Sequence, residues 1–228
     1  MTAIQVAVQG SLNILRQAEK AGIKIFVLAS SYVTLFDWRQ RPISRMLNDG
    51  DWNPATRDEA LSGSYDSMFV YCAEKTLQER AVWEFADQHP NLNITTVNPP
   101  FFFGPFVPGF MPRDATGLNA NEFIYALLDP EGLLFSDVAM GVDIRDVARA
   151  MISALSAPHY EPRKRLLISG EWFSWREAAD HIASPVATLM DTKRARELLA
   201  IEFTPWKTTI TDAVDSLLEA EELWSRTS

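Results

Sequence analysis

The stretch Tyr71-Cys72-Ala73-Glu74-Lys75 decides how this sequence is interpreted. The surrounding pattern predicts a helix over about 67–89, and a spacing of four residues then places Tyr71 and Lys75 on one stripe, about one turn apart. A neighbouring ammonium favours the phenolate form of tyrosine, whose ordinary pKa is about 10. The pair therefore predicts a proton donor tuned toward neutral pH, although this spacing alone equally fits a surface helix with an incidental neighbour.

Predicted strands on both sides of this helix give the pair a context. Residues 23–29 are apolar and β-branched, and two serines follow them, of which Ser31 is the second; residues 93–97 form a similar run that leads to Pro99. A strand, a crossover helix and a second strand make a right-handed parallel unit, and open α/β sheets bind ligands at the carboxyl ends of their strands. We therefore expect Ser31, Tyr71 and Pro99 to converge on one rim of a sheet.

Further landmarks occur in a fixed order along the chain. They are Gly10-Ser11-Leu12-Asn13-Ile14-Leu15, Val27-Leu28-Ala29-Ser30-Ser31, Trp52-Asn53-Pro54, Tyr71 to Lys75, Asn98-Pro99 with Gly104-Pro105, and Asp143-Ile144-Arg145-Asp146-Val147-Ala148. Through them, residues 6–224 resemble the extended short-chain dehydrogenase/reductases and, within these, the NAD-dependent epimerase/dehydratase group. The narrower likeness is to its dihydroflavonol reductase and methylglyoxal or aldehyde reductase branch.

The resemblance implies an α/β fold and a single domain. We expect residues 1–228 to form an N-terminally truncated, Rossmann-like NAD(P)-binding domain, a parallel sheet with flanking helices. Segments 100–142 and 171–228 would contribute most of a small substrate lobe, in which Phe101 and Asn119 are candidate pocket residues. An aromatic-lined pocket suits a hydrophobic carbonyl compound better than a nucleotide sugar.

The resemblance also implies a catalytic site. In this family the tyrosine, here Tyr71, exchanges a proton with the carbonyl oxygen, while the serine, here Ser31, donates a hydrogen bond to that oxygen. Lys75 would lower the pKa of Tyr71 and bind the ribose hydroxyls of the cofactor, and the backbone of Pro99 would lie against the nicotinamide. Ser30 is the competing assignment for the serine.

The implied cofactor is NADP, with NAD as the alternative, and the implied substrate is a small-molecule carbonyl compound. The sequence leaves open the identity of this substrate and the choice of reduction over epimerisation or dehydration. Glu74 stands where many relatives have serine, and its carboxylate would partly cancel the field of Lys75. The resemblance also allows a homodimer through the helix that carries Tyr71.

The beginning of the sequence departs from the family pattern. Its apolar spacing predicts a helix already in progress at Met1 that ends near Gly22, whereas the family begins with a strand and a Gly-x-x-Gly-x-x-Gly turn. None of the ten glycines of the chain forms that turn. A second hypothesis is therefore a non-catalytic truncated derivative, or an incomplete gene model, that is unable to bind the dinucleotide. In either case the strand over 23–29 would present an unpaired edge.

Composition limits the possible partners. A formal charge of −9 and a pI near 4.9 argue against nucleic-acid binding. A single cysteine excludes an internal disulfide, and three scattered histidines lack metal-ligand spacing. Because the sequence contains neither a long apolar run nor a signal peptide, we expect a cytoplasmic protein without a membrane partner.

Other polar residues favour structural interpretations. Residues 51–54, which include Trp52, are typical of a turn with a packed indole, and Cys72 of a small core residue. Asp143 has the position of a helix N-cap, and we expect Ser174 to cap a further helix that begins near residue 175.

Overall fold

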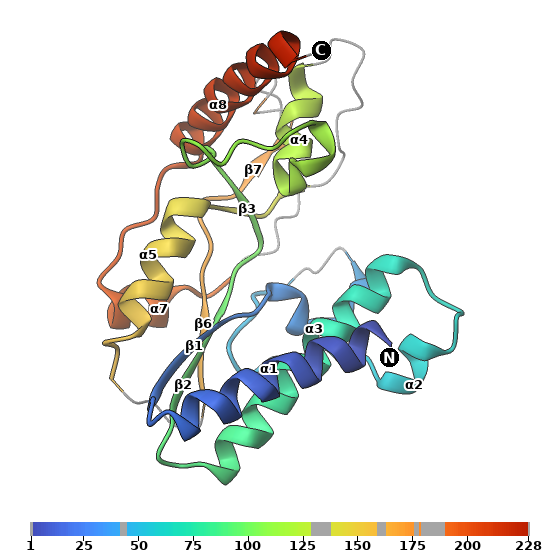
Figure 1. Cartoon of the computed structure of the whole chain (residues 1–228), viewed down its shortest axis with the longest axis vertical. Helices are drawn as coiled ribbons and strands as arrows, with labels where there is room; N and C mark the ends of the chain where they lie inside the picture. Colours follow the sequence, from blue (N-terminus) through green and yellow to red (C-terminus); the bar gives the residue numbers. More distant parts are fainter. Residues whose placement is uncertain are drawn as a thin grey trace.

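The computed structural model describes residues 2–41, 45–128, 138–158, 163–175, 178 and 190–227. Its centre is a parallel sheet of three strands in the order β1-β2-β6 (Figure 1). The strands are β1 (Ile25–Ala29), β2 (Asn93–Asn98) and β6 (Lys164–Leu167). The predicted strand–helix–strand unit is confirmed, because β1 and β2 pair in parallel and α3 (Ser67–Gln88) connects them.

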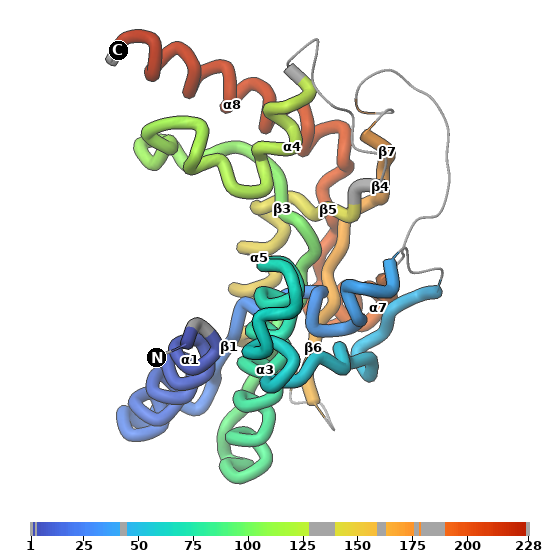
Figure 2. The backbone as a smooth tube through the Cα atoms, turned by 90° about the vertical axis from the view of Figure 1, so that its right-hand side faces the viewer, coloured from blue at the N-terminus to red at the C-terminus, as the bar shows by residue number. Residues whose placement is uncertain are grey.

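Helices cover both faces of this sheet (Figure 1, Figure 2). Helices α1 (Ala3–Lys20) and α3 pack on one face, while α5 (Ile144–Ala154) and α7 (Lys193–Leu199) pack on the other. Successive residues of a strand point to opposite faces, so Leu28 joins the cluster under α1 and α3 whereas Val27 packs against the cluster under α5. This doubly covered parallel sheet is the expected Rossmann-like arrangement.

Strand β1 lies at the edge of the described sheet, as expected. On either side of β1, the Lys24 carbonyl and the Ser30 N–H form hydrogen bonds with β2. Because backbone groups alternate along a strand, those of Ile25, Val27 and Ala29 point away from β2, and no other described strand pairs with them.

The first helix is confirmed and ends as expected before Gly22, but it begins at Ala3 and is not already in progress at Met1. A capping box between Thr2 and Gln5 starts α1, and Gly22 follows its end with a φ of 77°.

The face of α3 that packs on the sheet carries Cys72, Thr76, Glu79 and Trp83, which are buried and recur at helical spacing. The helix thus faces the sheet with polar as well as apolar side chains.

The remaining elements build a lobe at the opposite end of the molecule from α1 and α3, and a loop region beside β1 (Figure 1). The helices are α2 (Arg57–Leu61), α4 (Glu122–Tyr125) and α8 (Trp206–Thr227), with 3-10 turns at Tyr32–Thr34, Trp38–Gln40, Ala115–Gly117, Asn119–Asn121 and Ala126–Leu128. The strands are β3 (Phe101–Phe103), β4 (Val138–Ala139), β5 (Gly141–Asp143) and β7 (Phe173–Ser174). None of the helices described is both long and apolar enough to cross a bilayer.

The strand β3 carries the chain from the sheet into this lobe. It pairs in parallel with β5, and a Cβ added to Gly141 would lie 2.7 Å from the Phe103 ring. Phe103 is 1% exposed and packs edge-on against Trp175, with ring centroids 5.7 Å apart. The lobe core is therefore aromatic. The helix expected after Ser174 lies mostly outside the described residues.

The capping interpretation of Asp143 is confirmed. Its carboxylate accepts from the Arg145 N–H at 2.7 Å at the start of α5 and from the Thr209 hydroxyl of α8 at 2.9 Å. Arg145 in turn pairs with Asp212 at 2.6 Å. Burial alone would raise the pKa of Asp143, but these hydrogen bonds and the charge of Arg145 hold that pKa below its usual value. Asp143 therefore ties α5 to α8.

Candidate functional site

The structure brings Ser31, Tyr71 and Pro99 together at the carboxyl ends of β1 and β2. The Ser31 hydroxyl lies beside the Tyr71 phenol and acts to lower its pKa. The N–H of Tyr32 donates to the Pro99 carbonyl at 2.9 Å, which fixes the chain after Ser31 against the end of β2. Tyr71 is 42% exposed, so its phenol is accessible from outside the fold.

The Ser31 hydroxyl is oriented by its own backbone segment. It caps the 3-10 turn Tyr32–Thr34 by accepting the N–H of Val33 at 3.4 Å. A hydroxyl that accepts in this way keeps its own proton for a partner, and its effect on Tyr71 is to favour the phenolate, as a donated hydrogen bond does. Ser31 is thus placed to donate to an oxygen at the position of the Tyr71 hydroxyl.

The pKa of Tyr71 is raised, whereas sequence reasoning expected Lys75 to lower it. Burial is the main cause, the Ser31 hydroxyl opposes it, and the Cys72 thiol and the Glu74 carboxylate add to the rise. The phenol therefore keeps its proton at neutral pH. The half-buried Lys75 makes no hydrogen bond or ion pair with any residue that the structure describes, so its ammonium is available to a ligand.

Ser30 points to a different partner. Its hydroxyl donates to the Glu79 carboxylate at 2.5 Å inside the fold, and Glu79 is 0% exposed. Since Ser31 lies beside Tyr71 and Ser30 bonds to Glu79, the two candidate serines have separate environments.

Glu79 belongs to a buried polar network that sequence reasoning missed. One carboxylate oxygen accepts from Ser30 and from Asn98 at 2.8 Å, and the other pairs with Arg165 of β6 at 2.7 Å. The guanidinium of Arg165 also donates to the carbonyls of residues 49 and 51 and lies 3.8 Å from the Trp52 ring centroid. A basic pair, Lys164–Arg165, at the start of an otherwise apolar strand was the available signal. Trp52 is packed under this guanidinium, as the structural interpretation of 51–54 expected.

Aromatic residues continue from the rim toward the lobe. The rings of Tyr32 and Phe101 are 6.1 Å apart and those of Phe101 and Phe123 are 5.4 Å apart. Asn119, the other candidate pocket residue, is exposed, and its side chain donates to the Gly117 carbonyl. Cys72 is fully buried, and burial raises its pKa to about 12, which agrees with a core role.

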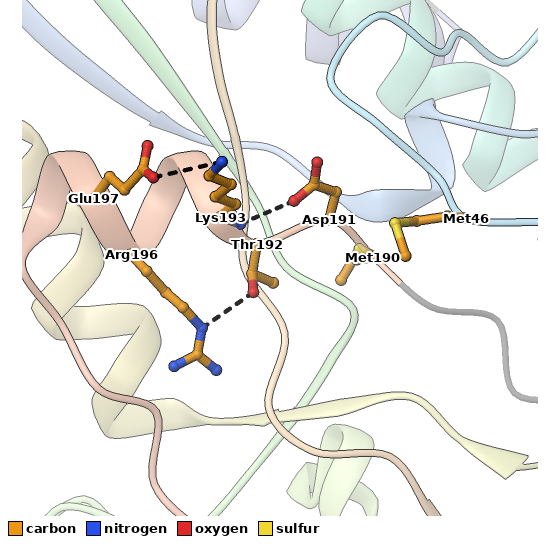
Figure 3. A pocket seen from close by; sticks show the side chains of 7 residues that line it. All are labelled: Met46, Met190, Asp191, Thr192, Lys193, Arg196 and Glu197. Atoms are coloured by element: carbon orange, nitrogen blue, oxygen red, sulfur yellow. Dashed lines mark hydrogen bonds and ion pairs between the residues drawn. The ribbon is translucent and has the colours of Figure 1, made fainter.

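A separate cavity of about 490 Å³ lies beside α7 (Figure 3). Its lining residues are Met46, Met190, Asp191, Thr192, Lys193, Arg196 and Glu197. Some of its polar groups bond to one another, as in the Lys193–Glu197 pair at 3.9 Å and the bond from Arg196 to the Thr192 hydroxyl at 3.2 Å. None of the predicted site residues lines it. In the described part of the chain, no three His, Cys, Asp or Glu side chains are grouped to hold a metal ion.

Comparison with known proteins agrees with this fold. The model of the NAD dependent epimerase/dehydratase family matches residues 2–168. The chain is 27% identical over 242 residues to NADPH-dependent methylglyoxal reductase GRE2 of Saccharomyces cerevisiae, a match that covers 94% of this chain and 69% of that protein.

Solved structures show the same fold. Yeast methylglyoxal/isovaleraldehyde reductase Gre2 complexed with NADPH superposes with a TM-score of 0.81 at 25% identity, over 95% of this chain and 70% of that one. Gre2 from Candida albicans gives a TM-score of 0.82 at 22% identity, over 97% and 74%. The relatives are thus NADPH-dependent reductases, and the chain is distantly similar to them over about 70% of their length.

Proposed function

This chain belongs to the NAD-dependent epimerase/dehydratase family, and from that membership we propose that it is an NAD(P)H-dependent oxidoreductase acting on a carbonyl or secondary alcohol through Ser31, Tyr71 and Lys75. The observation that carries the proposal is that the ends of β1 and β2 and the helix α3 bring Ser31 beside Tyr71, with the ammonium of Lys75 one helical turn further along α3. These are the groups that a carbonyl reduction requires, a proton donor, a second hydrogen-bond donor and a cation.

The residues present fit the reacting end of a nicotinamide cofactor. Lys75 would bind ribose hydroxyls, because its ammonium offers three donors and no described residue takes them. The Pro99 backbone, held by Tyr32, would line the nicotinamide side of the rim. The bound cofactor would supply hydride to the carbonyl carbon. NADP is the preferred form, as the yeast relative is NADPH-dependent.

Tyr71 and Ser31 would act together on the carbonyl oxygen. Because its pKa is raised, Tyr71 is protonated at neutral pH and has a proton to give to the developing alkoxide. Ser31 would donate a hydrogen bond to the same oxygen and stabilise its charge. The lobe segments 100–142 and 171–228, with Phe101 beside Tyr32, would cover an apolar carbonyl substrate.

The second candidate is a non-catalytic member of the family. The observation that favours it is that the 228 residues contain no Gly-x-x-Gly-x-x-Gly pattern. Such a protein would keep the fold of the rim without holding a dinucleotide.

Fluorescence titration of the purified chain with NADPH and NADH separates the two candidates. A dissociation constant below about 100 μM, which corresponds to about 5.5 kcal/mol of binding free energy, supports the oxidoreductase if binding is lost in Lys75→Ala. Lys20→Ala is the matched control, because this exposed lysine lies at the end of α1. No binding by the unaltered chain would exclude the oxidoreductase and favour the non-catalytic candidate.

Tyr71→Phe tests the proton donor. It removes the hydroxyl and keeps the ring, so we expect it to abolish NADPH oxidation with isovaleraldehyde while leaving cofactor affinity within about twofold. Turnover retained by this variant would show that Tyr71 is not the acid.

A further inference from the structure

We propose that Glu79, together with Arg165, is a positioning residue that holds Ser31 and the end of β2 in register with Tyr71. The inference rests on the proposed function and adds a residue to that site. Glu79 lies on α3 two turns beyond Tyr71 and one turn beyond Lys75, on the face turned toward the sheet.

The Glu79 carboxylate connects the three elements that carry the site. It accepts from Ser30, the neighbour of Ser31 at the end of β1, and from Asn98, the neighbour of Pro99 at the end of β2. Since Glu79 itself belongs to the helix of Tyr71, one carboxylate fixes the distances between the helix and both strand ends. A shift of about 1 Å in such distances costs about 100-fold in rate in enzymes.

A second path leads from this carboxylate to Ser31 itself. The Asn98 amide nitrogen lies 2.8 Å from Glu79, 3.1 Å from the Thr34 hydroxyl and 3.3 Å from the Ser31 carbonyl. The Thr34 hydroxyl donates to the same carbonyl at 2.9 Å. The backbone of Ser31 is therefore held on its carbonyl side by groups that Glu79 orients.

Arg165 fixes the carboxylate from the opposite side. Both side chains are almost fully buried, at 1% and 0% exposure, and their 2.7 Å ion pair is completed by guanidinium bonds to the loop at residues 49 and 51. A buried pair of this kind adds little net stability over an apolar pair, but it is geometrically strict because every donor must find its acceptor.

Glu79→Gln tests the inference with a side chain of the same shape. The glutamine amide has one acceptor oxygen, which will bond to the guanidinium of Arg165. The N–H groups of the glutamine then face Ser30 and the Asn98 amide. The Asn98 oxygen has no hydrogen-bond partner among the described residues. It can accept from the new amide if Asn98 turns, and that turn takes its N–H groups away from the Ser31 carbonyl and Thr34.

The first readout is the ionisation of the Tyr71 phenol, which needs neither cofactor nor turnover. Each protein and its Tyr71→Phe counterpart are titrated with base, and the difference between their absorbances near 295 nm reports the Tyr71 phenolate. The titration covers the alkaline range in which circular dichroism shows that the fold is intact. We expect Glu79→Gln to raise the pKa of Tyr71 by about one unit, because the Ser31 hydroxyl, which acts to lower that pKa, is displaced from the phenol. Loss of the negative charge of Glu79 would by itself lower the pKa of the phenol. A purely electrostatic effect and a loss of positioning therefore predict shifts of opposite sign.

Asp146→Asn is the matched control. Asp146 is also a 0% exposed carboxylate, bonded to the Thr204 N–H and paired with Arg149, but it lies in α5 and contacts none of the rim residues. We expect it to leave the pKa of Tyr71 unchanged. If Glu79→Gln does not fold, Thr34→Val replaces it, because it removes one bond to the Ser31 carbonyl and should shift the pKa in the same direction.

The second readout is the rate with isovaleraldehyde and NADPH. A positioning role predicts that Glu79→Gln lowers kcat about 10-fold or more while cofactor affinity stays within about twofold. An unchanged or lowered pKa of Tyr71 in Glu79→Gln, or an equal rise in Asp146→Asn, would overturn the inference. Absence of turnover in the unaltered chain would instead refute the proposed function, and the phenol titration would still decide whether Glu79 positions Ser31.

Discussion

Ser30 and Ser31 are adjacent in sequence, yet their hydroxyls lie in different surroundings. Alternate residues at the end of a strand point to opposite sides, so one hydroxyl enters the buried network at Glu79 and the other reaches the phenol of Tyr71. The first is therefore a structural group, whereas the second is the one to which we assign a role in the proposed reaction.

This difference predicts that two alanine substitutions will destabilise the protein to different extents. Ser30→Ala leaves the buried Glu79 carboxylate one donor short, so we expect a loss of about 1–3 kcal/mol in the free energy of unfolding, measured with urea. Ser31→Ala removes a weak cap at 3.4 Å and should cost less than about 1 kcal/mol. A larger loss in Ser31→Ala than in Ser30→Ala would contradict this assignment.

At the scale of elements, α3 shows what sequence could and could not predict. The stripe of Tyr71 and Lys75 was predictable, because helical spacing fixes it, and the strands before and after the helix identified the rim. The burial of Glu79 was not, because a glutamate on a long helix normally faces water. Its partner Arg165 lies 86 residues away, so only the folded sheet brings the two charges together. For the same reason, spacing could not show that burial raises the pKa of Tyr71.

The helix α5 offers a pH test. The pKa of Asp143 is lowered in the folded state, so its carboxylate stabilises the fold fully above its unfolded pKa of about 3.9 and loses that contribution as the pH falls through the lower folded value. Asp143→Asn should therefore be less stable than the parent by about 1–2 kcal/mol at neutral pH.

The difference between the two proteins should shrink below about pH 4. Urea unfolding of both proteins across this range provides the measurement. A difference that stays constant or grows as the pH falls would show that the ionised carboxylate is not the stabilising form.

At the scale of the whole molecule, the sheet and the lobe are continuous. The chain passes from β2 into β3, and α8 is tied to α5 through Asp143 and Arg145. We therefore expect the lobe and the sheet to unfold together, so that a substitution in the lobe core lowers the stability of the entire chain.

Phe103→Ala tests this coupling. The ring is 1% exposed and contacts the rings of Phe173 and Trp175, so its loss should cost about 3–5 kcal/mol. In a chain of 228 residues this corresponds to a fall in Tm of about 6–20 °C. Tryptophan fluorescence and far-ultraviolet circular dichroism should shift together, whereas a shift in fluorescence alone would show that the lobe unfolds separately.

The free edge of β1 also governs how copies of this chain behave toward one another. The outward N–H and C=O groups of Ile25, Val27 and Ala29, which pair with no described strand, can hydrogen-bond to a further strand, and exposed Ile23 lies beside them. Any extended segment of a neighbouring copy can dock there, so turbidity will grow with concentration. The charge of Lys24, directly before this strand, opposes such contacts.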